Sequence, residues 1–190
     1  IIPSNKFNFK DGLMKSVEVY TNLKSILKEK GLSVSVGDEG GFAPNLKTSE
    51  EVLDLIILSI ERTGLIYLDD ISIALDCAAS ELFNKETYRL TGENKKYSSE
   101  EMVVYIQSLV DKYEIKSVED PFDETDWNAW KTFTNNNKGL QIVGDDIFVT
   151  QEKILTKGIE NKVANSILIK LNQVGTLSET CLLYTSPSPR

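Results

Sequence analysis

The chain has 190 residues, of which 41% are hydrophobic and 26% charged, an ordinary composition for a globular domain with its own core. Its net charge of −8 argues against nucleic acid or an anionic membrane as the main partner. It contains no apolar run of about 20 residues that could span a membrane. Two cysteines make no disulfide framework, so we expect a reducing, cytoplasmic compartment. Histidine is absent, which leaves carboxylates, lysine, cysteine and hydroxyl groups for any chemistry.

The sequence pattern in the first third of the chain predicts two helices. One covers residues 10–30, where apolar side chains recur at helical spacing and Gly31 stands at the position of a C-terminal cap. The other runs from about Ser49 to Arg62, with Thr48 and Glu51 as a capping box and an apolar face behind them.

Strands and helices then alternate. Four short apolar runs, each ending in a charged residue, occupy 71–76, 115–120, 141–146 and 166–170. Helical patterns lie between them at 100–113 (capped by Ser98 with Glu101), around Trp127, Trp130 and Phe133, and at 151–158. This alternation is typical of parallel β/α units, and runs without polar alternation suit a sheet covered on both faces. An open doubly wound sheet and a closed barrel both fit this pattern.

The charged residues at the ends of the four runs are Asp76, Glu119, Asp145 and Lys170. In an α/β barrel the carboxyl ends of the strands converge on one rim, where active sites form. Three converging carboxylates repel one another unless a cation lies between them, and oxygen ligands without His or Cys suit Mg²⁺. The alternative is that these acids simply begin the turns after strands, as capping residues commonly do.

Lys170 is a candidate base because a nearby divalent cation disfavours its charged form. A strand-end lysine that extends into solvent is the alternative. Glu39 is a candidate acid, since the glycines of the 37–41 loop allow tight backbone turns that expose it. A plain surface turn is the alternative there, although Phe42 and Pro44 favour an ordered loop.

Five segments together resemble enolase, the phosphopyruvate hydratase family. They are residues 36–45 (VGDEGGFAPN), 74–81 (ALDCAASE), 117–122 (SVEDPF), 143–146 (VGDD) and 168–176 (LIKLNQVGT). Their order and spacing agree with the family from Ile2 to about Thr180. The resemblance implies the α/β fold of the C-terminal TIM-like barrel domain, which opens with an atypical antiparallel strand pair.

The resemblance also implies roles for individual residues. Asp76, Glu119 and Asp145 would bind Mg²⁺, and Glu119, Asp145 and Lys170 would contact the substrate, 2-phosphoglycerate. Lys170 would remove the proton at C2, and Glu39 would protonate the hydroxyl that leaves C3. A lysine base working with Mg²⁺ is the known chemistry of this superfamily. The family is a homodimeric, cytoplasmic enzyme of glycolysis, with no nucleic-acid or membrane partner implied.

Three departures from the family matter. The chain lacks the α+β domain that precedes the barrel, and its first residues are neither an initiator Met nor a signal peptide. It also lacks the later strands, which carry a histidine, an arginine, a serine and a lysine for the substrate. Residues 181–190 do not fit the family, and we expect a non-helical tail from linker translation or an assembly error. We therefore expect residues 1–180 to form a partial barrel, incomplete at both ends, that is inactive and aggregation-prone alone.

Two other functions stay open at this point. A racemase or sugar-acid dehydratase of the same superfamily would use a different base pattern, and a substrate screen would reveal it. A non-catalytic binding protein on the same scaffold need not hold Mg²⁺ at these carboxylates, so a magnesium titration would identify it.

Overall fold

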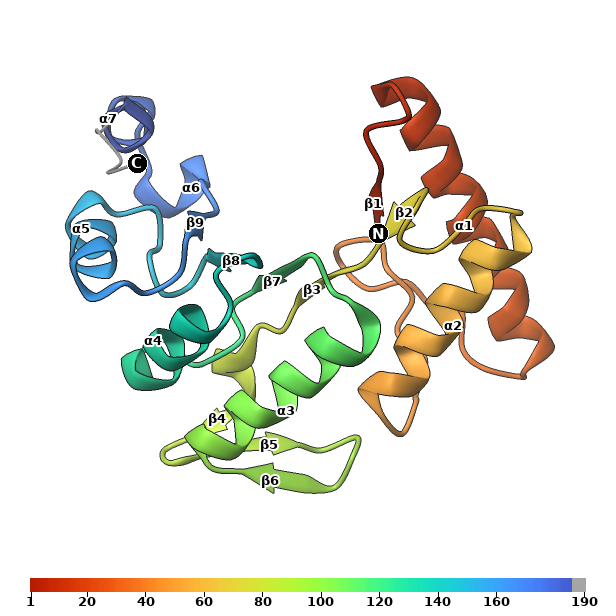
Figure 1. The fold of residues 1–190 in the computed structure, drawn as a ribbon, viewed down its shortest axis with the longest axis horizontal. Helices are drawn as coiled ribbons and strands as arrows, with labels where there is room; N and C mark the ends of the chain where they lie inside the picture. Colours follow the sequence, from red (N-terminus) through yellow and green to blue (C-terminus); the bar gives the residue numbers. More distant parts are fainter. Residues whose placement is uncertain (186–190) are drawn as a thin grey trace. The chain divides into compact units, whose positions relative to one another are not determined.

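The computed structural model describes residues 1–185, with side chains through Leu183. The described chain divides into two compact units (Figure 1). The first comprises residues 1–73 and 90–95, and the second comprises the remainder. Across the described residues, no helix has both the length and the apolar character needed to cross a membrane.

The first unit pairs two helices with a small antiparallel sheet. Its elements are β1 (Ile2–Pro3), α1 (Phe9–Glu29), α2 (Ser49–Arg62) and β2 (Ile71–Ser72). Strand β1 runs antiparallel to β2, as the family resemblance implies. Helices α1 and α2 pack on each other around a core of Val19, Ile60 and Ile71. Both predicted helices are therefore confirmed.

The start of α2 forms half of the predicted capping box. The Thr48 side chain accepts the backbone N–H of Glu51, as expected for an N-terminal cap. The Glu51 carboxylate, however, accepts the N–H of Lys47 at 2.9 Å, one residue before the position that the prediction required. The predicted start of α2 and the cap at Thr48 are confirmed, whereas the predicted bond from the Thr48 N–H to the Glu51 carboxylate is not formed.

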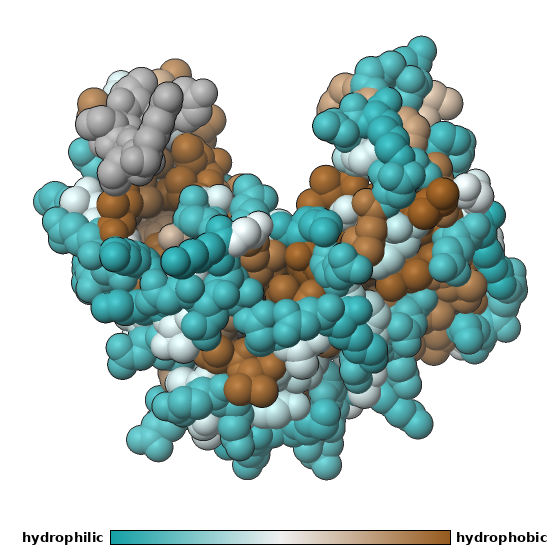
Figure 2. Space-filling model, in the orientation of Figure 1, coloured by the Kyte–Doolittle hydropathy of each residue, from teal (hydrophilic) through white to brown (hydrophobic). Residues whose placement is uncertain are grey.

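One face of α1 is apolar and exposed. Phe9 is 87% exposed, while Leu13 and Val17, which follow at intervals of four residues on the same face, are 54% and 55% exposed. Brown, apolar surface is visible over this unit in Figure 2. Exposed apolar surface favours association, but the expectation that the chain alone is aggregation-prone stays a prediction.

The second unit is built on a parallel sheet. The strands β3 (Ala74–Asp76), β7 (Ser117–Glu119), β8 (Gln141–Gly144) and β9 (Ser166–Ile167) lie side by side in that order, all parallel. Helices α3 (Ser99–Tyr113), α4 (Trp127–Asn136) and α5 (Glu152–Asn161) connect them. Because each strand lies next to its predecessor with no reversal of order, the sheet follows barrel progression and not the reversing order of a doubly wound sheet.

The core of this unit is formed by the sheet together with the buried faces of helices α3 and α4. Val118 and Ile142 are fully buried on neighbouring strands. Phe122 meets Trp130 and Phe133 edge to face, with ring centroids 6.1 and 5.4 Å apart. The predicted apolar face of α4 is thus confirmed, and Ser98 caps the start of helix α3 with the complete capping box that the sequence predicts.

The strands differ from the sequence-based expectations in three ways. The run 71–76 is two strands, because β2 pairs antiparallel with β1 whereas β3 pairs parallel with β7. The predicted strand at 166–170 ends at Ile167. A three-stranded sheet was not predicted at all, and its strands are β4 (Phe83–Asn84), β5 (Thr87–Leu90) and β6 (Lys95–Tyr97), preceded by a 3₁₀ turn at Ala79–Leu82.

The described part of the chain closes with two short helices, α6 (Leu171–Val174) and α7 (Leu177–Thr185). The expectation that the tail is non-helical from Cys181 was wrong for residues 181–185, since these contain no proline or glycine to stop a helix. The Ser-Pro-Ser-Pro part of the predicted tail lies outside the described residues.

Candidate active site

The carboxyl ends of the parallel strands meet at one edge of the sheet. Asp76 and Glu119 are the last residues of β3 and β7 and stand opposite each other in register. Asp145 follows the end of β8, and Lys170 stands three residues beyond β9, as the residue that precedes α6. The structure thus brings the four residues predicted from strand ends to one edge, while their individual roles stay predictions.

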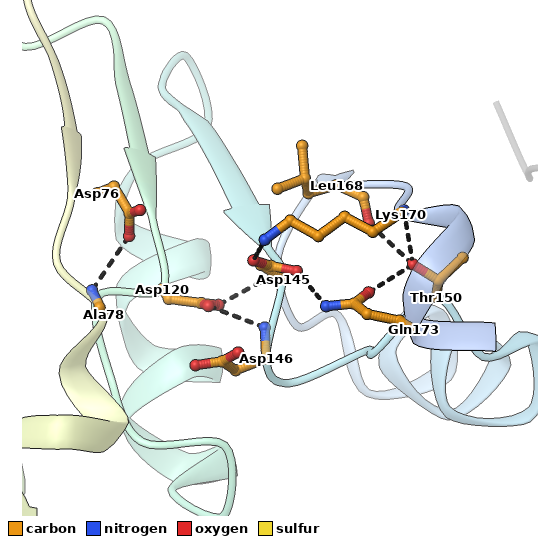
Figure 3. A network of polar contacts seen from close by, with 9 residues as sticks. All are labelled: Asp76, Ala78, Asp120, Asp145, Asp146, Thr150, Leu168, Lys170 and Gln173. Atoms are coloured by element: carbon orange, nitrogen blue, oxygen red, sulfur yellow. Dashed lines mark hydrogen bonds and ion pairs between the residues drawn. The ribbon is translucent and has the colours of Figure 1, made fainter. Parts of the chain in front are cut away.

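Lys170 turns inward along this edge (Figure 3). Its Nζ donates to Oδ2 of Asp145, whose side chain is only 9% exposed. The Lys170 side chain is 40% exposed, but its ammonium is paired with a buried carboxylate, unlike that of a lysine that simply extends into solvent. The same carboxylate accepts a hydrogen bond at its other oxygen, Oδ1, from Nε2 of Gln173 at 2.7 Å.

Asp120 holds the backbone beneath this pair. It is 3% exposed, has a positive φ of 40°, and accepts the N–H groups of Asp145 at 3.0 Å and of Asp146 at 2.8 Å. The sequence analysis gave Asp120 no role, although a second acid directly after Glu119 was the available signal. Because both of its oxygens face backbone donors, Asp120 fixes the direction in which the Asp145 side chain leaves the strand.

The three residues predicted to bind Mg²⁺ are not the three acids whose carboxylate oxygens lie close together in the structure. Among the described residues, Asp120, Asp145 and Asp146 bring one carboxylate oxygen each within 4.8 Å of one another. Only Asp145 belongs to both this cluster and the predicted set, which also included Asp76 and Glu119. Asp76 is exposed, and its Oδ1 accepts the N–H of Ala78 at 3.1 Å.

Crowding of carboxylates changes their protonation. Burial, followed by repulsion from Asp76, Asp145 and Asp120, raises the pKa of Glu119 to about 7, against a smaller opposing effect of Lys170. Burial also raises the pKa of Asp120 to about 6, partly offset by the two backbone N–H groups that it accepts. A hard divalent cation would relieve this repulsion, and the all-oxygen donor set fits Mg²⁺ better than Zn²⁺.

Cys77 stands beside these acids but does not suit nucleophilic chemistry. Burial and the charges of Asp76, Asp120 and Glu119 raise the pKa of its thiol to about 12. The thiolate is the reactive form of cysteine, so this residue stays an unreactive thiol near neutral pH. Carboxylates and Lys170 remain as the reactive groups at this edge.

Glu39 lies in an ordered loop of the first unit. The Gly37 N–H donates to the Gly41 carbonyl at 2.9 Å, and Gly40 adopts a φ of +85° that favours glycine. The Tyr20 hydroxyl donates to the Gly40 carbonyl at 3.0 Å, and its ring stacks on Phe42 with centroids 4.4 Å apart. Glu39 itself is exposed. Its pairing with Lys170 as acid and base stays a prediction.

This fold and this strand edge define a β/α barrel domain with an acidic, metal-suited edge and an inward lysine. Residues 1–185 match the family described as the enolase C-terminal TIM barrel domain. A curated relative, enolase from Natranaerobius thermophilus, is 48% identical over 181 residues. The chain accordingly belongs to the enolase family.

The aligned region covers 95% of this chain but 42% of that relative, so the chain spans less than half of the relative's length. The family match includes residues 181–185, which the sequence analysis had assigned to a non-family tail. The domain boundary at residue 180 stays a prediction.

Proposed function

We propose that this chain supplies the metal ligands, the base and the acid of a phosphopyruvate hydratase. The reaction removes the C2 proton of 2-phospho-D-glycerate and expels the C3 hydroxyl, which gives phosphoenolpyruvate. The observation that carries this proposal is the contact of Lys170 Nζ with Asp145, at an edge where burial and then neighbouring acids raise the pKa of Glu119.

A proton next to a carboxylate is a very weak acid, because its removal adds negative charge to the group that is already ionised. Asp76, Glu119 and Asp145 would hold Mg²⁺ at the strand edge. When bound, the ion would supply positive charge that stabilises the enolate-type transition state. The acidic edge thus suits a reaction in which negative charge develops on the substrate.

Lys170 would take the C2 proton on Nζ. A base must reach the proton that it removes and be neutral when it does so. In this structure Nζ donates to Asp145, so the amine must first give up that contact. Base and candidate metal ligand are therefore directly coupled, and removal of either one affects the other.

Glu39 would return a proton to the leaving hydroxyl. Hydroxide is a poor leaving group, so the second step needs an acid. The hydrogen bonds and ring stacking around the loop give Glu39 a fixed backbone. An acid and a base on opposite faces of the substrate suit anti elimination. The homodimer and the cytoplasmic location of the family are further proposals for the full-length protein.

The test is the formation of phosphoenolpyruvate by the full-length protein with Mg²⁺, comparing wild type with Lys170→Ala. General acid–base catalysis contributes about 10²–10⁴-fold, so we expect kcat to fall by that factor. Lys153→Ala is the matched control, because Lys153 lies exposed on α5. Wild-type activity in Lys170→Ala would overturn the assignment of the base. No activity in a folded, Mg²⁺-loaded wild type would overturn the proposed reaction.

A further inference from the structure

We infer that Gln173, held in place by Thr150, is a positioning residue that reserves one oxygen of Asp145 and so selects Mg²⁺ over Ca²⁺. This inference rests on the proposed role of Asp145 as a metal ligand. It is carried by a chain of hydrogen bonds that connects the base, the carboxylate and a buried hydroxyl (Figure 3).

A series of hydrogen bonds connects the backbone of Lys170 to the side chain of Asp145 through Thr150 and Gln173. Oγ1 of Thr150, a residue that is 1% exposed, accepts the backbone N–H of Lys170 at 2.9 Å. The same hydroxyl donates to Oε1 of Gln173 at 2.6 Å. Nε2 of Gln173 then donates to Oδ1 of Asp145 at 2.7 Å. A single buried hydroxyl therefore anchors both the backbone of the base and the amide that contacts the carboxylate.

The direction of each hydrogen bond is fixed by chemistry. An ionised carboxylate only accepts, so Gln173 must present its NH₂ group to Asp145 and its oxygen to Thr150. Thr150 must then donate its only hydroxyl hydrogen to Gln173, since the alternative acceptor, the Leu168 carbonyl, lies farther away at 3.5 Å. A flip of the amide would place two donors or two acceptors face to face, so the orientation of Gln173 is set.

Two backbone observations support a fixed function for this hydroxyl. Val149 and Thr150 both have positive φ, at 41° and 54°, a conformation that β-branched residues rarely adopt. Such strained residues persist where the surrounding contacts fix them, and they cluster at functional sites. Here the Thr150 hydroxyl, in that conformation, contacts both the backbone N–H of Lys170 and the side chain of Gln173.

The two oxygens of Asp145 consequently have different surroundings. Oδ1 accepts the amide of Gln173, and Oδ2 faces Nζ of Lys170. The backbone N–H of Asp145 is held by Asp120 at 3.0 Å, so the side chain starts from a fixed position. With Oδ1 engaged by Gln173, the oxygen that Asp145 would offer a cation is Oδ2, once Lys170 gives up its contact there. One-oxygen carboxylate ligands suit six-coordinate Mg²⁺, whereas Ca²⁺ takes six to eight ligands and often binds both oxygens of a carboxylate.

Removal of the amide should therefore change metal preference as well as metal affinity. Gln173→Met keeps an unbranched side chain but loses the N–H donor, which frees Oδ1 for a second bond to Ca²⁺. Thr150→Val keeps the shape and loses the hydroxyl, so it should act in the same direction. Thr150→Ser keeps the hydroxyl and should preserve the wild-type preference. Gln151→Met, at an exposed neighbouring glutamine, is the control substitution.

The experiment measures the dissociation constants of Mg²⁺ and Ca²⁺ by calorimetry on the full-length protein and its variants, with circular dichroism as the check on folding. Partners of metal ligands typically contribute 10–100-fold to affinity, so we expect Mg²⁺ binding to weaken about tenfold in Gln173→Met. We expect Ca²⁺ binding to hold or strengthen, so that the Mg²⁺ preference falls about tenfold.

Equal weakening of both metals, or no change in either, would overturn the inference while leaving the metal site itself intact. Should the wild-type protein bind neither metal, the proposed function would fail first. The two failures are thus distinguishable, because the first concerns the ratio of the two metals and the second the binding of wild type.

Discussion

Magnesium binding should strengthen as pH rises from 6 to 8, because Glu119 must lose its proton to act as a ligand. Burial and three neighbouring acids raise the pKa of Glu119 to about 7. A group with that pKa is about 9% ionised at pH 6 and about 91% at pH 8, so apparent Mg²⁺ affinity should increase about tenfold. Calorimetry in two buffers of different ionisation enthalpy measures both the affinity and the protons released on binding.

The stability of the metal-free protein should follow the opposite trend. An acid whose pKa is raised by folding stabilises the folded state at low pH, and this contribution is lost as pH rises through the folded-state pKa of about 7. Asp76→Asn should lower the pKa of Glu119, and with it the pH midpoints of Mg²⁺ binding and of metal-free stability. The pKa should stay above its ordinary value, because burial is the larger cause of the shift. Mg²⁺ affinity that is constant between pH 6 and 8, with no proton release, would refute this reasoning.

Three substitutions test the packing that supports the strand edge. Asp120→Asn replaces one acceptor oxygen with an NH₂ group, leaves a buried backbone N–H unsatisfied, and should lower the free energy of unfolding by about 1–3 kcal/mol, measured by urea denaturation. Tyr88→Phe removes a fully buried hydroxyl that donates to Asp126 at 2.8 Å, and an unchanged urea midpoint would contradict its expected cost of about 1 kcal/mol. Gly144→Ala would place a Cβ 2.5 Å from the ring of Phe148, and a thermal scan should show a lower midpoint from about 1–3 kcal/mol of overpacking.

Local signals predicted the helices, and nonlocal pairing explains what they missed. Ser98 and Glu101 lie three residues apart and decide the start of α3 between them. Strand β5, in contrast, is four residues long and gains its pairing only from other short strands. Ile73 separates two strands that run with different partners, a division that no property of the 71–76 run reveals.

The candidate site was predictable where strand geometry determines it. Parallel strands place their carboxyl ends together, and Asp76, Glu119 and Asp145 follow from that rule. Gln173 and Thr150 could not be assigned in the same way, because their contact joins a turn and helix α6 across 23 positions in the chain. Positioning residues of this kind have ordinary side chains and become visible only as hydrogen-bond partners.

Exchange of the C2 proton of 2-phosphoglycerate with deuterated water tests the central claim most directly, because it isolates the base from the acid. NMR would follow loss of the C2 proton in the full-length protein with Mg²⁺, in Lys170→Ala and in Glu39→Gln. The account predicts that Lys170→Ala loses both exchange and phosphoenolpyruvate formation, while Glu39→Gln loses product formation but keeps exchange. Exchange that persists in Lys170→Ala would contradict it.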